Sequence, residues 1–525
     1  MKTRSVLLYL PALPFRVEAL FPQRELAVVA GALLEEGHQT EIWDYGVVEE
    51  VARAKEGMVG GRTRVWLRAR HEAERRSQIV RRLCRERGLD FVAILAQTHA
   101  DMVEALHVGR ALRRAAPRIR QFLFGEHAVS FQAVLASAGD WDAVCTEESL
   151  AQLARVFGSP PQWGSVHGVC TGISSAAPAA RTPGFCGAFV LPEYSEEVYG
   201  AMAGAHKFRL FAVPRRGPQT GARHYDSPAP RAAVPGAAWR HSVEEVQWIQ
   251  RQWGARVFYL RGRFGTLDLL QGLNALSCRG SGLVLGTECD LDYMDEEAAD
   301  LLARFGCSFV SVDVDSGSQR LLEEFYGRRF GLSKAEQLLR GLRGAGVHIH
   351  ARLQFPCAED DYHTRAETVR FLSRAGVSTV ELTAPKIRPG SVWRQRADEF
   401  GFILQPRRHA DWCRGEEEAA WRRRAPGYRL RGWGRRRKAA EREHLLCELA
   451  ERGIQEAPAA AGLLARVSSR IDSEQSYLEG LHGCLTNFDA EAIYAMIRGF
   501  NDAASSSTVT SVVQRRDEMR TAVGN

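Results

Sequence analysis

Residues 90–127 read DFVAILAQTHADMVEALHVGRALRRAAPRIRQFLFGEH. Within them, residues 91–96 and 121–124 are apolar runs rich in β-branched or aromatic side chains, which predict buried strands. Residues 100–116 carry apolar side chains at helical spacing and predict a helix. A strand, a helix and a second strand in this order indicate a βαβ unit, and therefore a parallel sheet with helices on its faces.

The same alternation extends toward the N-terminus. Residues 5–10 and 39–43 are strand-like, and residues 26–36 between them have a helical pattern. We therefore expect a doubly wound, Rossmann-like sheet over residues 1–158. No GxGxxG motif follows the first strand, which argues against NAD as a ligand.

Ligands of such sheets lie at the carboxyl ends of the strands. The residues that follow the expected strands are Pro11, Gln97, Thr98, His99, Gly125, Glu126 and His127. These loops are the predicted binding region of the first domain.

A second βα series begins after residue 200. Six strand-like runs, at 209–213, 257–260, 283–286, 309–314, 348–353 and 379–382, alternate with helical patterns. Their number suits a partial (β/α)6 barrel, whose active site would lie at the carboxyl ends of its strands. The predicted organisation is a Rossmann-like domain at 1–158, a linker at 159–200, a barrel at 201–398 and a helical C-terminal segment at 399–525.

Composition narrows the class of protein. A chain of 525 residues with 45% hydrophobic and 25% charged residues suits a multidomain globular protein, and it contains no apolar run long enough for a membrane span. The N-terminus shows no secretory pattern, so we expect a cytoplasmic location. The net charge of +7 is not arranged as a nucleic-acid module, and we expect no nucleic-acid partner. Nothing indicates an oligomeric state.

Motifs in the first domain resemble the cobalamin-binding domain of cobalamin-dependent radical SAM proteins. The family's D-x-V strand, Thr-bearing turn and GG-x-H strand end correspond to residues 90–92, Thr98 and residues 125–127. Its vD-x-v-x-x-GEGE strand corresponds to residues 141–148, with Thr146 in place of a glycine. The resemblance implies that cobalamin would be bound by Pro11, Gln97, Thr98, His99, Gly125, Glu126, His127 and Glu147.

The resemblance continues in the barrel, where residues 215–225 read RRGPQTGARHY. At this point the family carries RGCPYGCTFC, whose three cysteines hold an iron–sulfur cluster. The corresponding positions here are Pro218, Ala222 and Tyr225. Proline and alanine have no donor atom, and a phenol is a poor substitute for a thiolate. We therefore expect no iron–sulfur cluster and no metal ligands for one.

A later segment resembles the part of the family that borders SAM. Residues 311–319 read SVDVDSGSQ and correspond to the family's G-x-ESGS segment, with Asp315 in place of glutamate. The resemblance implies that Asp315, Ser316 and Gln354 would contact SAM if SAM binds. The alternative is that Asp313 or Asp315 caps the helix that follows. The residues leave both alternatives open.

Two classes of function follow. The first is a cobalamin-dependent enzyme without a cluster, which performs methyl transfer or a cobalt-mediated redox or cyclisation step on a small natural-product intermediate. Its candidate catalytic residues are His224, Tyr225 and Glu288, at predicted strand ends. The polar barrel mouth suits a polar or anionic substrate. The second class is a non-catalytic scaffold that binds cobalamin or SAM; a third alternative is a barrel that binds a nucleotide without cobalamin.

The C-terminal segment carries Trp412, Trp421 and Trp433 among arginines. Such tryptophans either pack inside the fold or form a cation–π lid over the barrel mouth. The sequence does not choose between these two roles.

Overall fold

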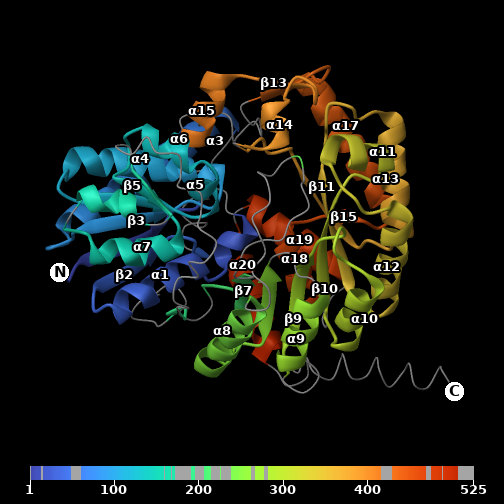
Figure 1. The fold of residues 1–525 in the computed structure, drawn as a ribbon, viewed down its shortest axis with the longest axis horizontal. Coiled ribbons are helices and arrows are strands. Elements are labelled where there is room, and N and C mark those ends of the chain that lie inside the picture. The colour runs from blue at the N-terminus through green and yellow to red at the C-terminus, as the bar shows by residue number, and fades with distance from the viewer. Residues whose placement is uncertain are drawn as a thin grey trace. The chain divides into compact units, whose positions relative to one another are not determined.

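Two mainly parallel sheets organise the chain, and each belongs to its own unit (Figure 1). The first unit comprises Met1–Phe208, Leu404–Tyr428 and Gly483–Ile497, and the second comprises Arg209–Ile403, Arg429–His482 and Arg498–Asn525. The computed structural model describes residues 2–12, 16–48, 61–158, 160–166, 168–171, 191–194, 206–214, 225, 238–261, 266–276, 282–388, 390–415, 428–468, 474–487 and 489–505.

The first unit contains a six-stranded sheet with the order β2-β1-β3-β4-β5-β6. Its strands are β1 (Arg4–Tyr9), β2 (Gln39–Asp44), β3 (Phe91–Leu95), β4 (Arg120–Phe124), β5 (Ala143–Cys145) and β6 (Val169–Cys170). The first five are parallel, and β6 runs antiparallel to β5. The order reverses between β1 and β3, which is where doubly wound sheets bind ligands. The predicted Rossmann-like fold is confirmed.

Helices cover both faces of this sheet (Figure 1). They are η1 (Val17–Leu20), α1 (Arg24–Glu35), α3 (Gly61–Arg85), α4 (His99–Ala115), α5 (Glu126–Ser130), α6 (Gln132–Ser137), α7 (Glu147–Arg155) and η2 (Pro160–Ser165). α1 packs against α7, and α3 packs against α4. Near-complete burial of β3 explains its uniformly apolar sequence, because both of its faces are covered.

The second unit contains a seven-stranded sheet with the order β15-β12-β11-β10-β9-β8-β7. The strands are β7 (Leu210–Pro214), β8 (Val257–Arg261), β9 (Val284–Cys289), β10 (Phe309–Asp315), β11 (His348–Gln354), β12 (Thr379–Thr383) and β15 (Gln455–Glu456). All neighbouring pairs are parallel. Six consecutive βα strands were predicted, and all six form. β15 was not predicted.

One layer of helices follows these strands in chain order, and further helices complete the unit. The layer contains α8 (Ala238–Trp253), α9 (Thr266–Leu276), α10 (Glu296–Arg304), α11 (Gln319–Leu321), η4 (Leu322–Tyr326), α12 (Leu332–Gly344) and α13 (Tyr362–Arg374). The others are α14 (Val392–Gln395), α17 (Arg435–Ala450) and α18 (Ala459–Ser468). α18 packs against β10, β11 and β12 from the interior side, where Gly462 lies against Phe309.

The C-terminal residues are mainly helical, as predicted, and are shared between the units. α15 (Pro406–Arg414) belongs to the first unit, while α19 (Glu474–Asn487) and α20 (Ala490–Ser505) each contribute residues to both. Two short strands, β13 (Phe402–Leu404) and β14 (Tyr428–Leu430), pair with each other. None of the helices in the described part of the chain has the length and apolar character needed to cross a bilayer.

Candidate functional site

The predicted cobalamin residues of β3 and β4 meet at the carboxyl edge of the first sheet. The backbone N–H of Glu126 donates to Gln97 Oε1 at 3.0 Å, and the backbone N–H of His127 donates to the Ala96 carbonyl at 3.1 Å. Gly125, the residue directly before Glu126, has φ 104°. A Cβ at Gly125 would lie 2.7 Å from the Ala96 carbonyl oxygen, so only glycine allows the two strand ends to approach so closely.

Thr98 begins α4 through a capping box. Its hydroxyl accepts from the N–H of Asp101, and the Asp101 carboxylate accepts from the N–H of Thr98. This arrangement satisfies amide groups that the first helical turn leaves without partners. Burial raises the pKa of Asp101 to about 6, although the hydrogen bonds from Thr98 act to lower it. This carboxyl lies in the first turn of α4 and binds Thr98, one of the predicted cobalamin residues.

His99 and His127 are brought together, and α15 covers them. The indole of Trp412 stacks on His99 with ring centroids 4.8 Å apart and lies 5.5 Å from the ring of His127. His127 Nε2 lies 3.0 Å from the Cys413 carbonyl oxygen, which can only accept, so this nitrogen carries the hydrogen. Trp412 therefore packs within the first unit, and sequence reasoning did not identify it as part of this site.

Two further predicted cobalamin residues are placed differently. The Pro11 carbonyl accepts a hydrogen bond from Arg75 Nη2 at 3.1 Å, and Arg75 is itself buried and paired with Glu104. Glu147 is the first residue of α7, directly after the capping residue Thr146. The Pro11 carbonyl is thus held by an arginine that also forms a buried ion pair with Glu104.

In the second unit, the carboxyl ends of β8 to β11 carry a charged cluster centred on Arg352. Its guanidinium donates to Asp313 Oδ1 at 2.7 Å and to Glu288 Oε1 at 3.1 Å. The Tyr259 hydroxyl donates to Glu288 Oε1 at 3.3 Å. Burial, with the adjacent Glu288 charge, raises the pKa of Tyr259 well above its usual range. Glu288, a predicted catalytic residue, is therefore held between a cation and a phenol.

A second buried cation explains Asp315. Arg328 donates to Asp315 Oδ2 at 2.6 Å and to Asp290 Oδ1 at 3.0 Å, and Gln354 Nε2 donates to Asp315 Oδ1 at 2.8 Å. Both oxygens of Asp315 are engaged, and its backbone has φ 61°, an uncommon value for a residue other than glycine. The Asp315 carboxylate thus binds Arg328 and Gln354, which is a different role from capping of the helix that follows.

Ser316 takes a role close to the capping alternative. Its hydroxyl accepts from the backbone N–H of Ser318 at 3.2 Å, just before α11. The N–H of Gly317 is satisfied by Thr368 of α13 at 2.9 Å. The three residues predicted to border SAM, Asp315, Ser316 and Gln354, thus lie close together, and the first and last are bonded to each other.

Tyr225 is anchored by backbone hydrogen bonds to two other segments. Its N–H donates to the Tyr326 carbonyl at 3.2 Å, and its carbonyl accepts from the N–H of Trp393 at 2.9 Å. Its ring lies 5.3 Å from that of Phe400. The remaining predictions on this loop, Pro218, Ala222 and His224, lie outside the described residues.

With this geometry established, the chain can be compared with known proteins. No family model matches it. A structure of the radical S-adenosylmethionine methyltransferase TsrM from Kitasatospora setae, with cobalamin and a 4Fe-4S cluster bound, matches with a TM-score of 0.61 and 15% identity. The match covers 95% of this chain and 99% of that one. The chain has the fold of cobalamin-binding radical SAM enzymes.

Two other comparisons agree with this fold. The cobalamin-dependent radical SAM enzyme OxsB, with aqua-cobalamin and S-adenosylmethionine bound, gives a TM-score of 0.57 at 11% identity over 100% of this chain and 81% of that one. In sequence, cytidylyl-2-hydroxyethylphosphonate methyltransferase of Streptomyces wedmorensis is 37% identical over 111 residues. That segment spans 21% of this chain and 21% of that enzyme.

Proposed function

We propose that this chain is a cobalamin-dependent enzyme that transfers a methyl group to a small polar or anionic molecule and does so without an iron–sulfur cluster. The observation that carries the proposal is the shared fold, because the matched structures of TsrM and OxsB hold cobalamin. The sequence supports the absence of a cluster, since the cysteine positions of the radical SAM motif are occupied here by Pro218, Ala222 and Tyr225.

The carboxyl edge of the first sheet carries hydrogen-bonding side chains that suit cobalamin. Cobalamin has a rim of amides, and the amide of Gln97 and the exposed Glu126 at this edge can exchange hydrogen bonds with such a rim. His127 is a poor candidate for a cobalt ligand, because its Nε2 is committed to the Cys413 carbonyl. When bound, cobalamin supplies a carrier for the methyl group.

The barrel residues would bind and deprotonate the methyl acceptor. Arg352 has its guanidinium at the strand ends, where it can pair with an anionic group of a substrate as well as with Glu288. Glu288 is the group placed to accept a proton from the acceptor as the new bond to carbon forms. The relative from Streptomyces wedmorensis is named for a phosphonate substrate, which supports an anionic acceptor.

Cofactor analysis tests the proposal. The purified chain is incubated with hydroxocobalamin, and a second sample with iron and sulfide, before desalting, absorption spectroscopy and metal analysis. We expect about one cobalt per chain and no iron, since the expected cobalamin site is on the first sheet and the cluster ligands are missing. Stoichiometric iron would refute the cluster-free part. Failure to retain cobalt would refute the cobalamin part and leave a scaffold or nucleotide-binding barrel.

A matched pair of variants locates the site. Gln97→Leu removes an amide at the carboxyl edge, whereas Gln39→Leu changes an exposed glutamine at the opposite end of the same sheet. We expect Gln97→Leu to weaken cobalamin binding roughly five- to tenfold, as the loss of one hydrogen bond implies. Gln39→Leu should leave the affinity unchanged. Equal affinities in an equilibrium titration would exclude this edge.

A further inference from the structure

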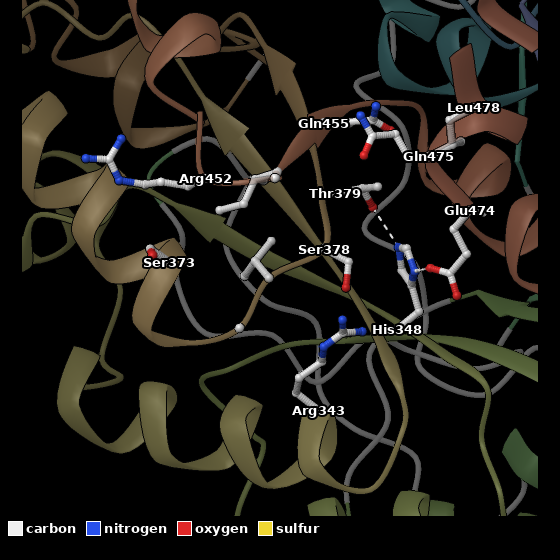
Figure 2. A pocket seen from close by; sticks show the side chains of 14 residues that line it. Arg343, His348, Ser373, Ser378, Thr379, Arg452, Gln455, Glu474, Gln475 and Leu478 are labelled. Carbon is white, nitrogen blue, oxygen red and sulfur yellow. Dashed lines mark hydrogen bonds and ion pairs between the residues drawn. The ribbon is translucent and has the colours of Figure 1, made fainter. Parts of the chain in front are cut away.

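A cavity of about 290 Å³ lies in the second unit at the amino ends of β11 and β12 (Figure 2). Residues of α12, α13 and α19 line it, together with residues 376–379 and 452–455. The groups proposed for catalysis lie at the carboxyl ends of the strands, as Arg352 does in β11. The cavity is therefore a separate pocket, and its volume is near the lower end of the range for small-molecule sites.

Arg343, in the last turn of α12, brings a positive charge to this cavity. Its side chain packs over Gly376, where a Cβ would lie 3.1 Å from Arg343 Cγ. Figure 2 shows the guanidinium directed toward Ser378 and His348. Among the described residues, none forms a hydrogen bond or an ion pair with this guanidinium. Its donors are therefore available to an oxyanion, which a guanidinium can bind through two hydrogen bonds.

Ser378 supplies a buried hydroxyl to the same cavity. Its backbone N–H donates to the Ile349 carbonyl at 2.8 Å, which fixes the residue directly before β12. Its Oγ is buried and has no hydrogen-bond partner in the part of the chain that the structure describes. Buried hydroxyls are usually hydrogen-bonded, and one without a partner destabilises the fold. Ser378 Oγ therefore indicates a ligand group that forms a hydrogen bond with it.

Glu474 is the one carboxylate among the described residues that line the cavity. Both of its oxygens are engaged, since Oε2 lies 2.7 Å from His348 Nδ1 and Oε1 accepts from Arg466 at 3.0 Å. Arg466 therefore offsets the charge of Glu474. The other cation of the lining, Arg452, has a hydrogen bond and an ion pair with neighbouring residues. The charge of Arg343 is left in excess, and a pocket with excess positive charge concentrates anions.

The opposite side of the cavity presents hydrogen-bond acceptors. Figure 2 shows Gln455 and Gln475 across the cavity from Arg343. Nε2 of each glutamine donates to Glu479 Oε1 at 3.1 Å, so neither carboxamide can turn without losing this bond. The carboxamide oxygens can accept hydrogen bonds from a hydroxyl group. Leu478 adds an apolar surface. This side suits the uncharged, polar part of a ligand.

We infer that the cavity binds a small molecule through an oxyanion, either a carboxylate or a phosphate group, that pairs with Arg343 and accepts a hydrogen bond from Ser378. The guanidinium and the hydroxyl both donate, and an oxyanion can accept from both. The polar remainder of the molecule faces Gln455 and Gln475. This site takes no part in the proposed methyl transfer, so it is tested without cobalamin or methyl acceptor.

The first test uses acetate and methyl phosphate as probes. Each carries one methyl group that NMR detects, and the two differ in their oxyanion. The full chain is titrated with each probe at constant ionic strength, and magnetisation transfer from the protein to the methyl group reports binding. We expect saturable binding of at least one anion, which identifies the preferred oxyanion, and none of methylammonium, which has the opposite charge. No saturable binding of either anion would overturn the inference.

Variants locate the bound anion. Arg343→Gln should weaken binding roughly tenfold or more, because it removes a charged hydrogen-bond donor. Arg340→Gln is the matched control, since Arg340 lies on the same helix, is 64% exposed and pairs with Glu336, and its affinity should stay unchanged. Ser378→Ala should weaken binding roughly fivefold without lowering the urea midpoint of the free protein. Equal affinities of Arg343→Gln and Arg340→Gln would place the anion elsewhere and overturn the inference.

Discussion

At the scale of single residues, Arg328 is a buried cation that binds two buried carboxylates in the second unit. Its guanidinium is buried with Asp290 and Asp315 as its partners, and these carboxylates raise its pKa further although burial acts against the charge. Arg328→Met leaves those buried carboxylates without their cation. We expect a loss of about 3–5 kcal/mol in the free energy of unfolding, measured by urea denaturation.

Arg320→Met is the matched control for this prediction. Arg320 forms ion pairs with Glu324 and Glu359, but all three side chains are more than 45% exposed. Exposed pairs contribute roughly 0–1 kcal/mol, so this variant should unfold near the normal urea concentration. Similar losses in the two variants would contradict the importance assigned to burial of Arg328.

Glu474 gives a prediction with a defined pH window. Burial acts to raise its pKa, but the hydrogen bond and charge of His348, with those of Arg466, outweigh burial and lower the pKa to about 2 from an ordinary value of 4.5. The folded form therefore binds fewer protons than the unfolded form between these values. The stabilisation is complete above pH 4.5 and is lost as the pH falls toward 2.

Comparison with Glu474→Gln isolates this contribution. At pH 7 the glutamine variant should be less stable than the unmodified protein, and the difference should shrink as the pH is lowered from 4.5 toward 2. Urea denaturation at pH 7 and at pH 3.5 provides the two values. A difference independent of pH would show that the carboxylate charge of Glu474 does not contribute.

At the scale of elements, the turn from β4 into α5 depends on Gly125. Gly125 and Gly139 both have positive φ, 104° and 75°, but a Cβ at Gly139 meets nothing within 4 Å, whereas one at Gly125 meets the Ala96 carbonyl. Gly139→Ala should cost only the backbone strain of about 1 kcal/mol. Gly125→Ala should cost more and should also weaken cobalamin binding, since the strand ends must separate. Equal losses of stability would contradict the close approach.

The strands and helices with a clear hydrophobic period were predictable. The strand expected at 91–96 forms as β3, Phe91–Leu95, and the helix expected at 100–116 forms as α4, His99–Ala115. The two-residue strands β6 and β15 could not be predicted, because two residues carry no period.

The candidate site was predictable only in part. Strand-end residues such as Gln97 and Glu288 could be named, because parallel strands bring their ends together. The partners that fix their roles could not, since Arg328 reaches Asp290 across 38 residues and His127 reaches Cys413 across 286. No local pattern encodes such distances. The sequence does not distinguish the buried Arg328 from the exposed arginines of the chain.

At the scale of the whole molecule, the first unit is assembled from segments far apart in the chain. α15 covers His127 and Phe131, and Trp412 lies 5.4 Å from the ring of Phe131. A fragment of residues 1–208 lacks this helix. We expect it to bind a hydrophobic dye and to unfold at a lower urea concentration than the first unit of the full chain.

Trp412→Ala in the full chain is the companion measurement. Removing this partly buried indole should cost about 3 kcal/mol in the first unit and increase dye binding, though less than in the fragment, which loses all of α15. If neither protein bound the dye, the strand ends would be stable without α15.

The domain boundaries at 158, 200 and 398 stay predictions, and residues 404–428 group with the first unit.

This arrangement affects how the protein is made on the ribosome. The first sheet emerges early, but the helix that shields His99 and His127 is encoded about 200 residues after Phe208. At roughly 5–20 residues per second, its arrival lags by about 10–40 s. Nascent chains would therefore display the aromatic edge of a formed sheet to chaperones throughout this interval, and messages translated slowly between these segments would favour aggregation.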